Sequence, residues 1–374
     1  MMAGIYIHIP YCTKACHYCD FHFSTSRHDQ DRMVKAISAE LKLRRDYLEG
    51  ASVETIYFGG GTPSVLTTDQ LDGLLNSILK SFRVAGDPEI TLEANPEDLQ
   101  RNRLEFLKKA GINRLSIGIQ TFHDVTLKAL NRVHDSHQAR RAVDDARQAG
   151  FTNLSLDIMF AIPGRSANQL QSDLDQMLAF APEHISAYGL TVEERTVLGR
   201  QAAKGAFTAL PDDDQAAEFE QVMDTLEAAG YRQYEVSNFC RPGFASRHNS
   251  AYWKGVPYLG VGPGAHSFNG ICRQANVANN SRYMTALESG QVPAEVEILS
   301  DRDKIHDYLL TSLRTEAGCD FRYLRDKLGY TARESYLKGL QQSGHAVMEQ
   351  DKLILTRKGK MIADRIASDL FLND

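Results

Sequence analysis

The chain of 374 residues carries 42 Lys and Arg against 48 Asp and Glu, which gives a formal net charge of -6. Apolar residues make up 43% and charged residues 24%, a balance typical of a globular protein with one large and one small domain. The acidic balance argues against a nucleic-acid partner, and no apolar run approaches the roughly 20 residues that span a bilayer. No signal peptide is predicted, so we expect a cytoplasmic protein whose cysteines stay reduced.

The first half of the chain repeats one unit, in which a short apolar segment precedes an amphipathic stretch. Strands are predicted over 4–10, 55–61, 89–96, 114–120, 153–163 and 184–191. Helices are predicted over 31–48, 68–82, 97–110, 123–130, 135–149 and 167–180. This alternation predicts an α/β fold with a parallel sheet, here a partial (β/α)6 barrel. Catalytic groups would then lie at the carboxyl ends of the strands.

The second half is less regular. A linker-like stretch over 192–211 precedes a helix predicted over 212–229, whose acidic start suits a helix N-terminus. The tail then reads as helices over 301–316, 320–328 and 331–343, a hairpin, and a helix over 357–371, which predicts an α+β winged-helix-like domain. We therefore expect three parts: a barrel core over 1–200, a barrel extension or connecting region over 201–295, and the winged-helix-like domain over 296–374.

Three of the six cysteines, Cys12, Cys16 and Cys19, lie on the loop that follows the first predicted strand. Three thiolates this close in a reducing compartment favour a metal centre over disulfides. They suit three corners of a 4Fe–4S cluster, whose fourth iron then lacks a protein ligand. The alternative is a zinc ion bound by the three thiolates and a nearby His17 or His22.

Other polar and glycine-rich motifs lie at the ends of the later strands. The glycines of "GGGTP" (59–63) let backbone groups approach a ligand closely, although they also suit a tight turn. Glu93, Gln120 and Asp157 add carboxylate and amide groups, which suit ribose hydroxyls and an ammonium group. Arg132, in "LNRVH", suits a carboxylate, and its alternative role is a solvated cation at a helix end.

The spacing C-x3-C-x-aromatic-C, with Tyr18 as the aromatic residue, resembles the signature of the radical S-adenosylmethionine superfamily. The resemblance implies a 4Fe–4S cluster on Cys12, Cys16 and Cys19, with S-adenosylmethionine on the open iron. Cleavage of that cofactor to a radical would need an electron donor, and the sequence leaves open whether cleavage occurs. The cofactor contacts implied by motif are Tyr6, Tyr18, Gly60, Gly61, Thr62, Glu93, Gln120, Arg132 and Asp157.

Four motifs together, "YIHIP", "GGGTP", "EANP" and "IGIQTF", resemble one branch of that superfamily. The branch holds the oxygen-independent coproporphyrinogen III dehydrogenases and the heme chaperones. Phe21 stands where the dehydrogenases carry a fourth cysteine, and we expect their N-terminal extension to be absent. "HNSAYW" (248–253) resembles the H-N-x-x-Y-W motif of the chaperones, which is associated with heme. The resemblance therefore favours the chaperone group.

Two histidines are candidate heme ligands. His248 is favoured as the axial ligand because imidazole commonly binds heme iron, and its alternative is a buried structural histidine beside aromatic residues such as Trp253. His266, in "GPGAHSF", is the second candidate. The remaining cysteines, Cys240, Cys272 and Cys319, are expected to be packing thiols.

The expected function is therefore that of a heme chaperone, which binds heme and passes it to acceptor hemoproteins, including membrane-bound ones. Contact with the membrane would be peripheral and limited to delivery. The alternatives are radical decarboxylation of coproporphyrinogen III and another tetrapyrrole-modifying radical reaction. The sequence leaves a homodimer open, and the acidic charge disfavours DNA binding by the winged-helix-like tail.

Overall fold

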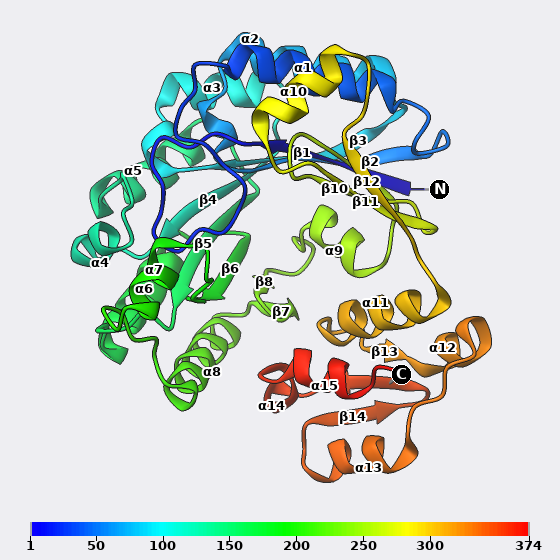
Figure 1. Ribbon diagram of the computed structural model, residues 1–374. Helices are drawn as coiled ribbons and strands as arrows, with labels where there is room; N and C mark the ends of the chain where they lie inside the picture. Colours follow the sequence, from blue (N-terminus) through cyan, green and yellow to red (C-terminus); the bar gives the residue numbers. More distant parts are fainter. Residues whose placement is uncertain (1, 373–374) are drawn as a thin grey trace.

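A 12-stranded sheet forms the centre of the molecule in this computed structural model, which describes residues 2–372 (Figure 1). Met1 and residues 373–374, at the ends of the first and last predicted parts, lie outside this range. The strands run in the order β12-β11-β10-β9-β1-β2-β3-β4-β5-β6-β8-β7. The six that run in parallel along the chain order are β1 (Met2–Ile9), β2 (Ser52–Gly60), β3 (Val84–Ala94), β4 (Arg114–Gln120), β5 (Leu154–Phe160) and β6 (His184–Gly189). The predicted partial (β/α)6 barrel is confirmed.

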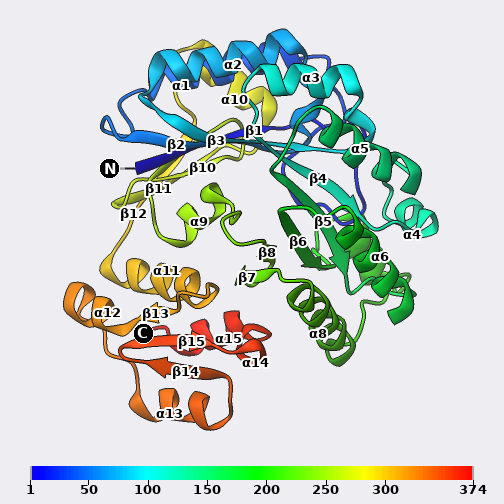
Figure 2. The ribbon, with the colours of Figure 1, turned by 180° about the vertical axis from the view of Figure 1, so that it is seen from behind.

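Helices cover the convex face of this curved sheet, and its concave face turns toward the inside of the molecule (Figures 1 and 2). The connecting helices are α1 (Gln30–Leu43), α2 (Thr68–Ser81), α3 (Arg101–Lys109), α4 (Asp124–Ala129), α5 (Ser136–Gln148) and α6 (Ala167–Ala179), with short 3-10 turns η1 (Pro63–Val65) and η2 (Pro96–Asp98). Capping boxes at Thr67, Asp135 and Ser166 fix the starts of α2, α5 and α6.

Alternation along each strand separates an apolar outer face from a polar inner one. In β1 the side chains of Ile5, Ile7 and Ile9 are fully buried in the hydrophobic core, which lies between sheet and helices. Tyr6 and His8, between them, point to the concave face. The same alternation sends the polar residues of the other strands into the interior of the partial barrel.

The region over 201–295 extends the sheet at both edges with short strands that the sequence analysis did not predict. β9 (Tyr258–Val261) pairs in parallel with β1, and antiparallel strands β10 (His266–Phe268), β11 (Cys272–Asn276) and β12 (Ala294–Ile298) continue from it. At the other edge β8 (Asn238–Cys240) lies between β6 and β7 (Arg232–Glu235). Strands of three to five residues are too short to show a clear period in the sequence. β12 also runs across the predicted boundary at residues 295 and 296.

Four helices lie in this region or, for the first of them, across its predicted start at residue 201. They are α7 (Val197–Ala203), α8 (Asp212–Ala228), α9 (Arg247–Trp253) and α10 (Asn280–Glu288). The predicted linker over 192–211 therefore contains a helix, α7, whose start is capped by the Thr196 hydroxyl. α9, which carries the "HNSAYW" motif, lies on the concave side of the sheet (Figure 2).

The last part of the chain has a hydrophobic core of its own, with Leu309, Leu313, Leu324 and Leu353 fully buried in it. It contains α11 (Asp301–Leu313), α12 (Phe321–Leu328), α13 (Glu334–Gln342), α14 (Arg357–Lys360) and α15 (Ala363–Asp369), and a small sheet in the order β13 (Cys319–Asp320), β15 (Lys352–Leu355), β14 (Ala346–Glu349). The single helix predicted over 357–371 is wrong, since it is divided into α14 and α15. Of the helices within residues 2–372, none combines the length and apolar character that crossing a membrane requires.

Candidate cofactor and ligand site

A cavity of about 780 Å³ lies at the carboxyl ends of the parallel strands, on the concave face of the sheet. Its lining contains all but two of the predicted site residues. These are Cys12, Cys16, Cys19, Tyr18, Gly60, Gly61, Thr62, Glu93, Gln120, Arg132 and Asp157. The two residues outside the lining are Tyr6 and His248, which lie side by side behind Tyr57 with stacked rings.

The cysteine loop is held by a short segment that follows α4. The Leu130 carbonyl accepts the His17 backbone N–H at 3.1 Å, and the Ala129 carbonyl accepts from His17 Nδ1 at 2.9 Å. Asn131 Nδ2 donates to the Ala15 carbonyl at 2.6 Å. Asn131 has φ 61°, a left-handed conformation that an asparagine adopts more readily than most residues. Segment 129–132 therefore positions the loop that carries the three thiols.

Two of the thiols accept hydrogen bonds from the cavity wall. Thr62 Oγ1 donates to Cys12 Sγ at 3.3 Å, and Arg132 Nη1 donates to Cys16 Sγ at 3.6 Å. Burial raises the pKa of Cys12 to about 12 and also raises the pKa of Cys19. A bound cationic centre would offset that cost by stabilising the thiolates.

The two histidines considered as a fourth zinc ligand are already engaged. His17 Nδ1 is bonded to Ala129, and His22 Nε2 lies 2.8 Å from Asn280 Oδ1. Within residues 2–372, no three His, Cys, Asp or Glu side chains are grouped closely enough to hold a single metal ion. A cubane cluster makes a different demand, because each thiolate binds a different iron atom. Each histidine uses only one ring nitrogen in these bonds, so it is the spacing of the three thiols that favours a cluster over the zinc alternative.

Arg132 is half-buried at the cavity wall and is not the solvated cation considered from sequence. Its Nη2 donates to Asn95 Oδ1 and to the Gly118 carbonyl, both at 2.7 Å, while its Nε is buried without a partner. Asn95 also donates to Thr62 Oγ1 at 3.3 Å. Sequence analysis overlooked Asn95, although it stands two residues after Glu93 in the "EANP" motif.

The glycine-rich loop needs glycine for steric reasons. Gly60 has φ +98°, and a Cβ there would lie 2.5 Å from the His8 imidazole. A Cβ on Gly61 would lie 2.6 Å from the Ile9 carbonyl. His8, a second residue that sequence analysis overlooked, is held by a hydrogen bond from Nε2 to the His22 carbonyl at 2.8 Å. Glycine therefore lets this loop pack closely against β1 and the residues that follow it, while Gly60 and Gly61 line the cavity.

Two half-buried carboxyl groups face the cavity from β3 and β5, the strands on either side of β4. Glu93 accepts a hydrogen bond from the Tyr57 hydroxyl at 2.7 Å, and Asp157 accepts one from the Ser116 hydroxyl at 3.2 Å. Burial raises the pKa of Glu93 to about 7 and that of Asp157 to about 6. A ligand that brings a positive charge and hydroxyl groups would stabilise the ionised form of both carboxyl groups. S-adenosylmethionine carries an ammonium group, a sulfonium group and ribose hydroxyls.

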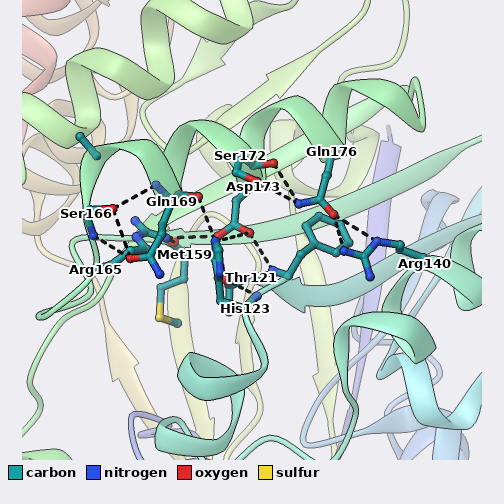
Figure 3. Close-up of polar contacts among 12 residues, drawn as sticks. Thr121, His123, Arg140, Met159, Arg165, Ser166, Gln169, Ser172, Asp173 and Gln176 are labelled. Atoms are coloured by element: carbon teal, nitrogen blue, oxygen red, sulfur yellow. Dashed lines mark hydrogen bonds and ion pairs between the residues drawn. The ribbon is translucent and has the colours of Figure 1, made fainter.

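The end of β4 is held in an unusual conformation by a network behind the cavity (Figure 3). Gln120 has φ 67°, which is uncommon for a residue other than glycine. Immediately after it, the Thr121 hydroxyl and the Phe122 backbone N–H donate to the buried Asp173 carboxylate at 2.6 and 2.8 Å. Asp173, on α6, thereby fixes the backbone that directs Gln120 to the cavity.

The end of β5 is held in the same way and by a linked group. Ala161 has φ 58°, and its backbone N–H donates to Glu218 of α8 at 2.6 Å. Arg165 lies 3.5 Å from Asp173 and donates to the Met159 carbonyl at 2.8 Å (Figure 3). It also lies 2.9 Å from Glu218, and it thereby joins the two carboxylates. This buried network supports two of the strand ends that line the cavity.

His248 is sealed rather than open. Its side chain stacks on Tyr57 with ring centroids 4.9 Å apart, its Nδ1 lies 2.7 Å from Thr55 Oγ1, and its Nε2 lies 2.8 Å from the Tyr252 hydroxyl. Burial lowers the pKa of His248 to about 3, so the imidazole is neutral at physiological pH. The Glu89 carboxylate, which accepts the His248 backbone N–H at 2.9 Å, ties the start of α9 to β3.

The other candidates from the sequence lie apart from the cavity. Tyr6 donates its hydroxyl hydrogen toward His8 Nδ1 at 3.2 Å, beneath the glycine-rich loop. His266 is exposed on β10. Cys240, Cys272 and Cys319 are buried, as expected of packing thiols.

Comparisons with known proteins agree with this geometry. Residues 6–177 match the sequence pattern of the radical SAM superfamily. The chain is 34% identical over 371 residues to the heme chaperone HemW of Bacillus subtilis, covering 98% of each chain. It is 36% identical over 372 residues to HemW of Mycobacterium tuberculosis, covering 98% of this chain and 94% of that one.

A solved structure shows the same fold. The coproporphyrinogen III oxidase HemN of Escherichia coli, a radical SAM enzyme, matches with a TM-score of 0.84 over 98% of this chain and 89% of that one. Its sequence identity of 22% restricts this likeness to the fold. The near-complete and much closer relationship is to the chaperones, and the chain belongs to the heme chaperone HemW family of the radical SAM superfamily.

Proposed function

We propose that this protein is a heme chaperone, which binds heme and transfers it to acceptor hemoproteins from a radical SAM scaffold. Its relationship over 98% of the chain to proteins named heme chaperone HemW carries the proposal. A residue at the cavity agrees with it. Phe21, which stands in place of the fourth cysteine of the dehydrogenases, is 68% exposed beside the thiol loop and lines the cavity.

The cavity residues fit the two cofactors that the family implies. Cys12, Cys16 and Cys19 would hold a 4Fe–4S cluster, and S-adenosylmethionine would be held by Tyr18, Gly60, Gly61, Thr62, Glu93, Gln120, Arg132 and Asp157. Tyr6 would act from behind the lining, through His8. When bound, the pair supplies one-electron chemistry. The unpartnered Nε of Arg132 and the two protonatable carboxyl groups are the observations that support the fit.

His248 would be the axial ligand of heme iron, provided that its ring nitrogen Nε2 becomes accessible. Its Nε2 is bonded to the Tyr252 hydroxyl, so iron must displace that hydroxyl to reach the nitrogen. α9 has only seven residues and is tied at its start to Glu89. A small movement of its second half would release Tyr252 and leave the start of α9 in place.

The remaining parts of the proposal concern partners and organisation. We expect the chain to act in the cytoplasm, with peripheral contact to a membrane when the acceptor is membrane-bound. An electron donor is needed only if S-adenosylmethionine is cleaved. We also propose that the chain divides at about residue 200 and about residue 296. The last part would be a winged-helix-like domain, and the protein would form a homodimer.

Heme transfer tests the function directly. Cluster-reconstituted protein is loaded with heme under anaerobic conditions, freed of excess by gel filtration and mixed with apomyoglobin. We expect the Soret band to shift to that of myoglobin, with the heme leaving one protein as it enters the other. If heme co-elutes with the protein but is not transferred to apomyoglobin, the protein binds heme without acting as a chaperone. Incubation with coproporphyrinogen III in parallel detects decarboxylated product, which the proposal does not expect.

A further inference from the structure

Arg114 is a buried cation at the cavity with no assigned role. It begins β4, on the same side of the strand as Ser116, Gly118 and Gln120, and it lines the cavity with them. It is 1% exposed and is the largest of the fully buried side chains within residues 2–372. Its Nε has no hydrogen-bond partner. A guanidinium keeps its charge at any physiological pH, so this charge is present inside the barrel and is not neutralised by deprotonation.

Two other arginines near this end of the barrel, Arg132 at the cavity wall and the buried Arg165, are anchored by hydrogen bonds. Arg132 and Arg165 each donate to a backbone carbonyl and to a side-chain oxygen, as described above. Arg114 has instead the attraction of two carboxyl groups, Glu93 and Asp157. Both accept hydrogen bonds from other side chains, the hydroxyls of Tyr57 and Ser116. Buried polar groups are normally paired, so an under-paired guanidinium at a cavity wall indicates a ligand atom.

The rest of the cavity shows what kind of ligand this would be. Apolar and aromatic side chains of Met159, Phe160, Leu190 and Phe219 line the same space. Phe160 and Phe219 stack with ring centroids 5.2 Å apart and interplanar angle 3°. The site thus combines an apolar wall with a fully buried guanidinium, that of Arg114, which suits an aromatic ring that carries an acidic side group. The planar fork of a guanidinium matches a carboxylate in two parallel hydrogen bonds.

We propose that Arg114 is the binding residue for a carboxylate of the tetrapyrrole, that is, for one of the propionates of heme. This inference rests on the proposed heme function and deepens it. Arg114, which has only the electrostatic attraction of Glu93 and Asp157, would gain direct hydrogen bonds to the ligand. The carboxylate would orient the ring in the cavity and would distinguish the free acid from an esterified tetrapyrrole.

The experiment compares heme with heme dimethyl ester, which lacks the two negative charges but keeps the ring and the iron. Both are titrated from the same co-solvent into cluster-reconstituted wild type, Arg114→Gln, Arg114→Lys and Arg103→Gln. Arg103 serves as the matched control, because it is a partly buried arginine with unpartnered nitrogens that lies on α3, away from the cavity lining. Melting temperatures are recorded for every variant.

We expect wild type to bind heme about tenfold or more tightly than the diester, as for a charge-assisted pair that is lost. Arg114→Gln should weaken heme binding to the level of the diester and leave diester binding within about twofold, while Arg103→Gln keeps the preference. Arg114→Lys keeps the positive charge but loses the planar guanidinium, so it should retain part of the preference for heme over the diester. Equal affinities of wild type for heme and diester would overturn the inference without any variant.

Two further outcomes separate this inference from the proposed function. If wild type binds neither compound, the heme proposal itself fails. If wild type prefers heme and Arg114→Gln retains that preference, another residue reads the carboxylate, and the heme proposal stands while Arg114 is reduced to balancing Glu93 and Asp157.

Discussion

The cavity wall and helix α9 both place polar and aromatic side chains on the concave face of the sheet, but they differ in how those groups are paired. At the wall, the Nε atoms of Arg114 and Arg132 lack partners, and two thiols have only weak contacts from one side. In α9, both ring nitrogens of His248 are hydrogen-bonded within the protein. Incompletely paired groups indicate a ligand, whereas a fully paired histidine must first break a contact.

The largest expected effect concerns the thiol loop. Replacement of Cys12, Cys16 and Cys19 by serine should reduce the iron bound after anaerobic reconstitution to background, because a cubane cluster depends on all three thiolates. Iron analysis and visible absorbance near 400 nm measure it. The matched control is Cys240→Ala, which removes a buried thiol from the sheet edge. Undiminished iron in the triple variant would contradict the assignment of the cavity.

The segment that holds the loop should matter next. Asn131→Ala loses the amide that bonds Ala15 and also disfavours φ 61°, whereas Asn131→Gly loses only the amide. We expect cluster loss in air to accelerate about tenfold in the alanine variant and by a smaller factor in the glycine variant. Equal half-lives in all three proteins would show that the loop holds the cluster unaided.

The sealed state of His248 gives a sharper test of that residue than its removal. Tyr252→Phe deletes the hydroxyl that occupies Nε2. If iron competes for this nitrogen, heme affinity should rise about fivefold, the equivalent of one hydrogen bond of about 1 kcal/mol. His248→Ala should weaken it, and both are read from Soret titrations. Unchanged affinity in the two variants would make His248 a structural residue.

The two regions should also respond to pH in opposite directions in the apo-protein. Glu93 has a folded pKa of about 7, above its usual value, so its contribution to the free energy of unfolding is full below pH 4.5 and falls as pH rises toward 7. His248 has a folded pKa of about 3, below its usual value, so its contribution is full above pH 6.5 and falls as pH drops toward 3.

Denaturant unfolding at pH 5 and pH 7 checks both signs. In wild type, ionisation of Glu93 should lower the free energy of unfolding by about 2 kcal/mol between pH 5 and pH 7, and Glu93→Gln should abolish this decrease. Protonation of His248 should lower it by a similar amount between pH 7 and pH 5, and His248→Gln should abolish that decrease. Glu194→Gln, at an exposed loop position, serves as the control. If Glu93→Gln and His248→Gln changed the pH dependence of the free energy of unfolding in the same direction, the pKa shift assigned to one of the two residues would be wrong.

The sequence predicts the parallel half of the fold well, because each unit from β1 to β6 pairs an apolar strand with a helical stretch, and α2, α5 and α6 begin at capping boxes. The short strands near the sheet edges, such as β8, were not predicted, because three residues do not define a hydrophobic period. The thiol loop and the strand-end residues were found by motif, and the structure gathers them at one cavity. Arg114, His8 and Asn95 were missed because their importance lies in their partners across the sheet, which no local pattern records.

An anaerobic titration of cluster-reconstituted wild type with heme tests the central claim most directly. The account predicts a saturable Soret change that ends near one heme per chain, and a complex that survives gel filtration. Absorbance that rises linearly with added heme, with all heme separating from the protein on the column, would contradict it.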